Sequence, residues 1–119
     1  MNNRKLFDSE LKVMELVWEL EPVSAKQISV ICNERIGWNK NTTYTILKKL
    51  VDKKIIRREE PNFICTSLIR KEEVQKEETE SLIERLYAGS RKAFFAAFFE
   101  NEELTDEEIA ELKAMIDKR

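Results

Sequence analysis

The residues with the most specific chemistry form a run of amide, hydroxyl and ammonium side chains near the middle of the chain. An asparagine can form two hydrogen bonds with the edge of an adenine, and a threonine offers a hydroxyl plus a methyl group that suits thymine. Lysines beside them can neutralise phosphates. The run therefore predicts a surface that binds double-stranded DNA, and its candidate residues are Asn39, Lys40, Asn41, Thr42, Tyr44, Thr45, Lys48 and Lys49.

Helical spacing places these side chains on one flank of a helix. With Asn39 as N-cap and a helix to about Lys53, the apolar set of Thr43, Ile46, Leu47 and Leu50 falls on the inner side. The outer side and the first turn then hold the polar run. Asn and Thr have modest helix propensity, so their concentration here is unusual. For any one of them an ordinary capped and solvated helix is a sufficient explanation, whereas the cluster favours DNA binding.

A basic band continues from this helix. Lys48, Lys49, Lys53, Lys54, Arg57 and Arg58 follow one another, and residues 40–58 carry seven Lys/Arg against one Asp, a net charge of +6. Because such a band attracts phosphates, Arg57 and Arg58 join the candidate DNA-binding residues.

Three helices and a hairpin must position these residues. Asp8 or Ser9 is a candidate cap for a first helix, whose broad apolar face runs from Leu11 to Leu20 and which ends at Glu21-Pro22. Ser24 and Gln27 form a capping box at the start of a second helix with Ile28, Ile31 and Cys32 inward, and Gly37 suits its end. After the third helix, residues 55–60 and 63–68 are predicted strands joined by a Pro61-Asn62 turn.

The remaining chain is predicted to be helical and acidic. One helix runs from about Lys71 to Ala88 before Gly89, a second covers 91–100, and a third follows the capping box of Thr105 and Glu108. We therefore expect a mainly α protein. Residues 1–70 form a winged helix-turn-helix (three helices plus a β-hairpin wing), and residues 71–119 form a C-terminal helical dimerisation domain.

Charge is divided unevenly between these two parts. Residues 1–71 hold 14 Lys/Arg and nine Asp/Glu, whereas residues 72–119 hold seven and 14. The net charges of +5 and −7 suggest that the first part meets a polyanion and the second does not. Ordinary surface variation remains the alternative explanation.

Apolar residues of the C-terminal part predict a homodimer. Four phenylalanines within ten residues would leave an exposed patch that a monomer rarely tolerates. Packing of this patch on the first domain is the alternative. The expected dimerisation residues are Leu82, Ile83, Leu86, Tyr87, Phe94, Phe95, Phe98, Phe99, Ile109, Leu112, Met115 and Ile116.

Several functions are disfavoured by composition. The chain has no histidine, no glycine-rich phosphate loop and no carboxylate pair in an apolar setting, so we expect neither an enzyme, nor a metal site, nor a cofactor. Cys32 and Cys65 are expected to be reduced thiols. No apolar run approaches the roughly 20 residues of a membrane span, and the segment after Met1 does not resemble a signal peptide, so we expect a cytoplasmic protein without membrane insertion.

Three segments resemble the penicillinase repressor family, of BlaI/MecI/CopY type. They are Asp8 to Trp18, Val23 to Ile28, and the run from Trp38 through Thr42, Tyr44-Thr45 and Leu50 to Ile56. The stretch from Glu102 to Leu112 is similar to the tail of its β-lactamase-regulating members. The resemblance implies a repressor that binds an inverted-repeat operator as a winged-helix homodimer. The family's usual Ser-Pro after the tryptophan is here Asn39-Lys40, and its usual glycine before the first wing strand is Lys54.

The resemblance also bears on how repression is relieved. Copper-responsive members carry C-terminal Cys-x-Cys motifs, whereas no cysteine follows Cys65 here. β-Lactam-responsive members are cleaved through a membrane-bound sensor metalloprotease system. The matching bond would be Ala97-Phe98, where the family typically has Asn-Phe.

A protein-binding function is the main alternative. The same winged-helix domain could serve a helical adaptor or interaction module. Binding to duplex DNA that falls steeply with salt would favour the repressor, since released counterions make phosphate binding salt-dependent.

Overall fold

The computed structural model describes residues 5–101 and 103–119, which form two compact units divided after Glu78. Each unit is described by itself below. Two features of the sequence lie outside the described residues. They are residues 1–4 of the N-terminal segment that does not resemble a signal peptide, and Glu102 of the C-terminal motif.

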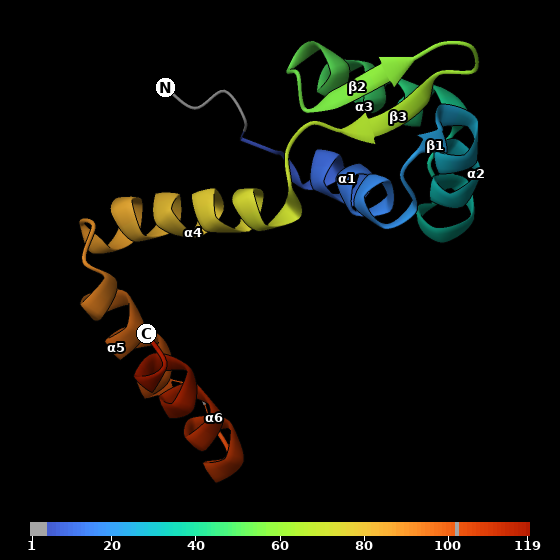
Figure 1. Cartoon of the computed structure of the whole chain (residues 1–119). Helices are drawn as coiled ribbons and strands as arrows, with labels where there is room; N and C mark the ends of the chain where they lie inside the picture. The colour runs from blue at the N-terminus through green and yellow to red at the C-terminus, as the bar shows by residue number, and fades with distance from the viewer. Residues whose placement is uncertain (1–4, 102) are drawn as a thin grey trace. The chain divides into compact units, whose positions relative to one another are not determined.

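The first unit places three helices and a hairpin in the predicted order (Figure 1). Its helices and strands are α1 (Asp8–Leu20), β1 (Val23–Ser24), α2 (Ala25–Ile36), α3 (Lys40–Asp52), β2 (Ile56–Glu59) and β3 (Ile64–Ser67), followed by the first turns of α4 (Lys71–Tyr87). The strands form an antiparallel sheet of order β1-β3-β2. Strand β1 was not predicted, because two residues are too few to show a strand pattern.

The core of this unit lies between the helices and the sheet. Val13, Met14 and Val17 of α1 are fully buried, and α3 packs against both α1 and α2. The predicted apolar face of α1 was too broad, since Leu11 and Leu20 are exposed. Trp18 is half-buried, and its Nε1–H donates to Ser67 Oγ and to the Ile69 carbonyl oxygen, each at 3.0 Å. Those bonds fix the indole ring against the strand that leads to α4.

Caps fix where the helices begin. Ser24 Oγ accepts the Gln27 N–H at 3.1 Å and Asn39 Oδ1 accepts the Thr42 N–H at 2.8 Å, which confirms both predicted caps. The predicted cap of α1 was wrong, because the helix already begins at Asp8 and its N-cap is Phe7. Glu10 compensates for the missing side-chain cap by accepting the Phe7 N–H at 2.9 Å.

Glu10 also forms a partly buried ion pair with Lys53. The Lys53 ammonium lies 2.8 Å from both Glu10 carboxylate oxygens, and the two side chains are 27% and 3% exposed. Lys53 was predicted to belong to the basic band, but its charge is directed inward. The pair ties the end of α3 to the start of α1.

Two buried thiols complete the core. Cys32 and Cys65 are both fully buried and unbonded to each other, and burial raises the pKa of each thiol, that of Cys65 to about 11. Because a thiol with a raised pKa stays protonated, both cysteines act as small apolar side chains at neutral pH.

The second unit contains the end of α4 with α5 (Arg91–Asn101) and α6 (Asp106–Asp117), close to the predicted bounds. Gly89 has a φ of +80° where α4 ends, and Thr105 and Glu108 form the predicted capping box. Among the described residues of this unit, Ile83 is the one that is buried. These helices therefore have almost no core within a single chain.

In the part of the chain that the structure describes, none of the helices is long and apolar enough to cross a membrane.

The Glu10–Lys53 pair should contribute measurably to stability. Replacing Glu10 with Gln removes the charge that pairs with the Lys53 ammonium and should lower the free energy of unfolding by about 1.5–3 kcal/mol. Urea unfolding followed by tryptophan fluorescence reports on this unit, because Trp18 and Trp38 are the chain's two tryptophans.

Glu15→Gln is the matched control. Glu15 pairs with Lys71 at 3.1 Å on the surface, so its loss should cost about 0–1 kcal/mol. Equal effects of the two substitutions would contradict a special role for the buried pair.

Candidate nucleic-acid interface

The turn between α2 and α3 determines where α3 begins. Gly37 adopts a φ of +86°, a conformation that strains residues with a Cβ, and its N–H bonds the Cys32 and Asn33 carbonyl oxygens at 3.0 Å. The Asn33 side-chain amide then donates to the Trp38 carbonyl oxygen at 3.0 Å. These bonds close α2 and hold the backbone one residue before the N-cap of α3.

The two sides of α3 differ as the helical spacing predicted. Thr43, Leu47 and Leu50 are fully buried, and Ile46 is half-buried against the same core. The polar residues on the outer side are exposed, namely Asn41, Thr42, Thr45, Lys48 and Lys49. Asn39 is exposed too, and its side-chain oxygen Oδ1 accepts the Thr42 N–H in the cap. The amide, hydroxyl and ammonium groups of α3 thus form one continuous polar surface, which we call the α3 face.

Tyr44 connects the α3 face to the hairpin. Its half-buried ring meets Phe63 edge-on at 6.0 Å between ring centroids, and the Lys40 ammonium lies 5.6 Å from the centre of the Tyr44 ring. This contact places the first turn of α3 next to the β2–β3 hairpin.

The hairpin is less basic than the sequence suggested. Arg57 pairs with Glu59 at 3.4 Å, and Arg58 pairs with Glu60 while its guanidinium lies 3.7 Å from the centre of the Phe63 ring. The hydrogen bond from Arg58 is the largest cause of a lowered pKa of the Glu60 carboxyl, so that carboxylate stays charged at neutral pH. Both predicted arginines therefore have a carboxylate partner two residues further along the chain, and these partners offset part of the predicted basic band.

A groove separates the start of α2 from the hairpin. It has a volume of about 520 Å³ and is lined by Ser24, Lys26, Tyr44, Arg58, Glu60, Asn62, Phe63 and Ile64. Lys26 was not among the predicted site residues. The sequence feature that could have identified it is a cation in the first turn of a capped helix, where the helix dipole also favours anions.

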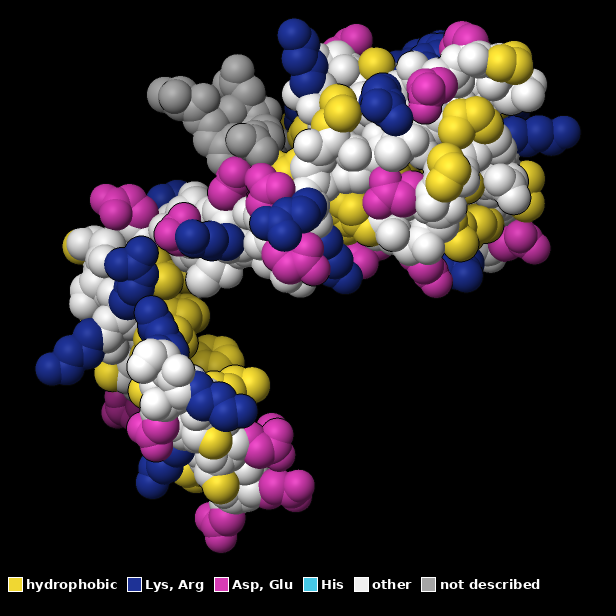
Figure 2. All heavy atoms as spheres, in the orientation of Figure 1, with side chains coloured by type: hydrophobic (Ala, Val, Ile, Leu, Met, Phe, Trp, Pro, Cys, Tyr) yellow, Lys and Arg dark blue, Asp and Glu magenta, His cyan; other side chains and the backbone are white. Residues whose placement is uncertain are grey.

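The predicted dimerisation residues divide into covered and open ones. Ile83 is buried, and Leu82, Tyr87, Phe94 and Leu112 are half-buried; Tyr87 meets Phe94 edge-on at 5.5 Å. The other seven are exposed, namely Leu86, Phe95, Phe98, Phe99, Ile109, Met115 and Ile116. We call these seven the open apolar patch. Figure 2 shows hydrophobic side chains uncovered along this part of the chain.

The candidate scissile bond lies within α5. Ala97 is half-buried and Phe98 is 47% exposed, and the Phe98 ring stacks on that of Phe94 with a centroid distance of 6.0 Å. The bond is thus part of a regular helix at the centre of the phenylalanine cluster.

Three helices, a two-stranded wing and an outward polar face on the third helix define a winged helix-turn-helix protein, as predicted. The solution structure of the DNA binding domain of the repressor BlaI has the same fold, with a TM-score of 0.55, 21% sequence identity, and coverage of 59% of this chain and 88% of that one.

Sequence comparison assigns the family. The penicillinase repressor profile matches residues 6–118, and the chain belongs to this family. It is 29% identical to the penicillinase repressor of Staphylococcus aureus over 91% of this chain and 87% of that protein. It is 26% identical to the methicillin resistance regulatory protein MecI of Mammaliicoccus sciuri over the whole of both chains. The penicillinase repressor of Bacillus licheniformis is 24% identical over 96% of this chain and 91% of that protein.

Proposed function

We propose that this protein is a transcriptional repressor that binds an inverted-repeat operator as a homodimer. The observation that carries the proposal is the α3 face. Its exposed amide and hydroxyl groups follow a helix start that is fixed by the Gly37 turn and the Asn39 cap. In helix-turn-helix proteins this end of the second helix of the motif contacts bases in the major groove.

The residues of the α3 face would make two kinds of contact with DNA, to base edges and to phosphates. Asn41, Thr42 and Thr45 present short side chains that suit base edges. Lys48 and Lys49 suit phosphates, as do Lys40 near the first turn and Lys26 across the groove. The paired arginines of the hairpin would contribute less, because Glu59 and Glu60 offset their charge.

The second unit supports the homodimer. With Ile83 as its one buried residue among those described, a single chain gains little hydrophobic stabilisation for three helices. Phe95 and Phe98 remain 48% and 47% exposed, so covering them with a second chain would contribute roughly half of the 1.5–3 kcal/mol that complete burial of such a side chain gives. Residues 71–119 would therefore form the dimerisation domain, and two linked winged domains would bind both half-sites.

Relief by proteolysis is the third part of the proposal. A cut between Ala97 and Phe98 would separate Phe98, Phe99 and α6 from the rest of the patch. A dimer held by that patch would weaken while the α3 face stayed intact. A membrane-bound sensor metalloprotease system is the proposed agent.

Substitutions on the α3 face should separate base recognition from phosphate binding. Asn41→Ala and Thr45→Ala should each reduce the preference for operator over random duplex by about 1–3 kcal/mol. Lys48→Gln and Lys49→Gln should weaken both complexes alike and make binding less salt-dependent, by about one unit of the log–log slope per lysine. Fluorescence anisotropy between 50 and 200 mM salt, on fragments selected from the source genome, measures both effects.

Lys76→Gln on α4 is the control, since Lys76 is exposed and lies outside the α3 face. Affinity for duplex that does not change with salt would overturn the repressor and favour the protein-binding adaptor.

Replacing two phenylalanines of the open apolar patch should yield monomers. The double substitution Phe95→Ser with Phe98→Ser removes two exposed rings, so sedimentation at micromolar concentration should shift from dimer to monomer. Binding to a full operator should fall towards that of a single half-site. Lys92→Ser on the same helix should leave the dimer intact, and a wild-type chain that sediments as a monomer would contradict the proposal.

Cleavage should depend on the residues at the bond. Cells that contain the sensor system and are treated with a cell-wall antibiotic should accumulate a fragment ending at Ala97, detected by intact-mass spectrometry. Ala97→Pro should block the cut, because proline fits poorly at most scissile bonds and in α5. A wild-type chain that stays full-length under induction would exclude this mode of relief.

A further inference from the structure

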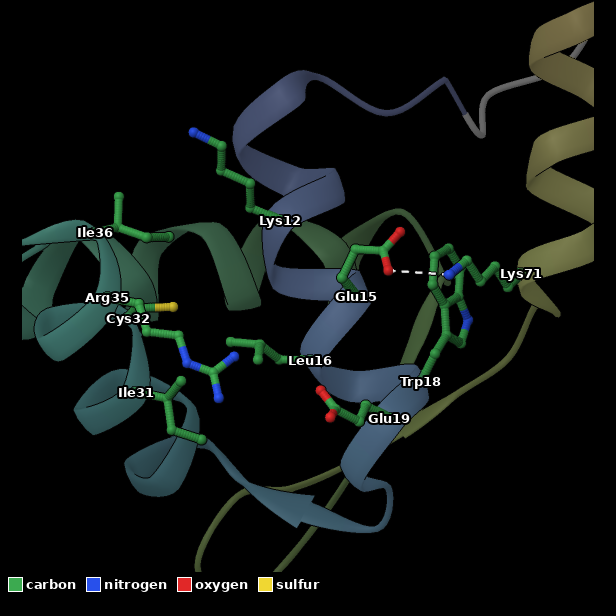
Figure 3. Close-up of a pocket in the computed structure, with 10 residues that line it drawn as sticks. All are labelled: Lys12, Glu15, Leu16, Trp18, Glu19, Ile31, Cys32, Arg35, Ile36 and Lys71. Carbon is green, nitrogen blue, oxygen red and sulfur yellow. Dashed lines mark hydrogen bonds and ion pairs between the residues drawn. The ribbon is translucent and has the colours of Figure 1, made fainter. Parts of the chain in front are cut away.

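A second cavity in the first unit lies away from the α3 face. It opens between α1 and α2, has a volume of about 590 Å³, and is closed on one side by Lys71 at the start of α4 (Figure 3). This volume falls within the usual range for small-molecule sites. None of Asn41, Thr42, Thr45, Lys48 and Lys49 lines it.

The cavity has a firm apolar lining. Leu16 of α1 and Ile31 and Ile36 of α2 line it together with Trp18. The indole of Trp18 is held by its two hydrogen bonds to Ser67 and Ile69, so this wall is fixed before anything binds. Such a surface suits a flat or branched apolar group.

The charged rim favours an anion. Lys71 is already paired with Glu15 at 3.1 Å, as the dashed line in Figure 3 marks. Within the described part of the chain, no carboxylate pairs with Lys12 or Arg35 at ion-pair distance. Figure 3 shows the Arg35 side chain extending from α2 towards Leu16 and Glu19 of α1. Apart from the Glu15–Lys71 pair, the charged residues of the lining are Lys12, Arg35 and Glu19, which together carry a net charge of +1.

We propose that this cavity binds a small organic anion with an apolar body, its carboxylate on Arg35 and its body against Trp18, Leu16 and Ile31. A guanidinium can form two parallel hydrogen bonds with one carboxylate, and an adjacent apolar wall strengthens them by excluding water. Glu19 lies in the same lining, so its negative charge repels the carboxylate of the ligand and weakens binding.

Three naphthalene derivatives test the ligand class. We expect 2-naphthoate to shift the backbone amide signals of Leu16, Ile31 and Arg35 in ¹H–¹⁵N spectra of the full-length protein. Naphthalene-2-methanol, which has the same body without charge, should bind at least about tenfold more weakly, and 2-naphthylmethylamine more weakly still. Equal affinity for the three compounds, or shifts confined to other residues, would overturn the proposal.

Two substitutions should act in opposite directions on naphthoate binding. Arg35→Gln should weaken it about tenfold, whereas Glu19→Gln should tighten it about two- to fivefold. Both residues are exposed, so neither change should disturb the fold, and Lys76→Gln is the neutral control. An Arg35→Gln variant that keeps its affinity would refute the assignment.

A protein segment is the competing occupant. A peptide with the sequence of residues 103–117, which is acidic and contains the helix α6, is the matched probe. If this peptide shifts the same signals and 2-naphthoate does not, the cavity is a protein-docking groove and the proposal fails. None of these measurements uses DNA, so their failure leaves the proposed repressor function untouched.

Discussion

The functional surface depends on the burial of one side of α3. Thr43, Leu47 and Leu50 are fully buried against α1 and α2, and because a helix is rigid, this packing turns the residues between them outward. The Gly37 turn and the Asn39 cap then fix the start of the helix. A substitution that disturbed the inner side would therefore disorient the α3 face without altering any of its polar groups.

Ion pairs determine which positive charges of this surface remain available to bind an anion. The linear sequence shows a continuous basic band, but three of its cations are paired with carboxylates. Lys53 has become a structural residue that joins α3 to α1, while Arg57 and Arg58 balance the two hairpin glutamates. Within the described part of the chain, the exposed cations of this surface that form no ion pair are Lys40, Lys48 and Lys49 of α3, Lys54 just after it, and Lys26 across the groove.

The two units differ in how they satisfy their apolar residues. The first unit exposes some apolar side chains, such as Leu11 and Leu20, but buries most of the others in one continuous core within a single chain, as an independent domain does. The second unit leaves seven large apolar side chains exposed and stacks its phenylalanines on one another, Phe94 on Phe98 and Phe95 on Phe99. This contrast supports the proposed division, in which the first unit would contact DNA and the second would contact another copy of the chain.

The sequence alone determined the helices, the hairpin and the direction of α3, because these follow from local rules of capping, glycine conformation and helical period. It supplied Ser24, Gly37, Asn39 and Thr105 as boundaries, together with the polar run from Asn39 to Lys49. The tertiary structure decided the strand β1, the pairing of Glu10 with Lys53, the neutralised arginines and the cavity between α1 and α2. Each of these brings together side chains whose meeting depends on how the backbone folds, and residue spacing along the chain does not encode such distances.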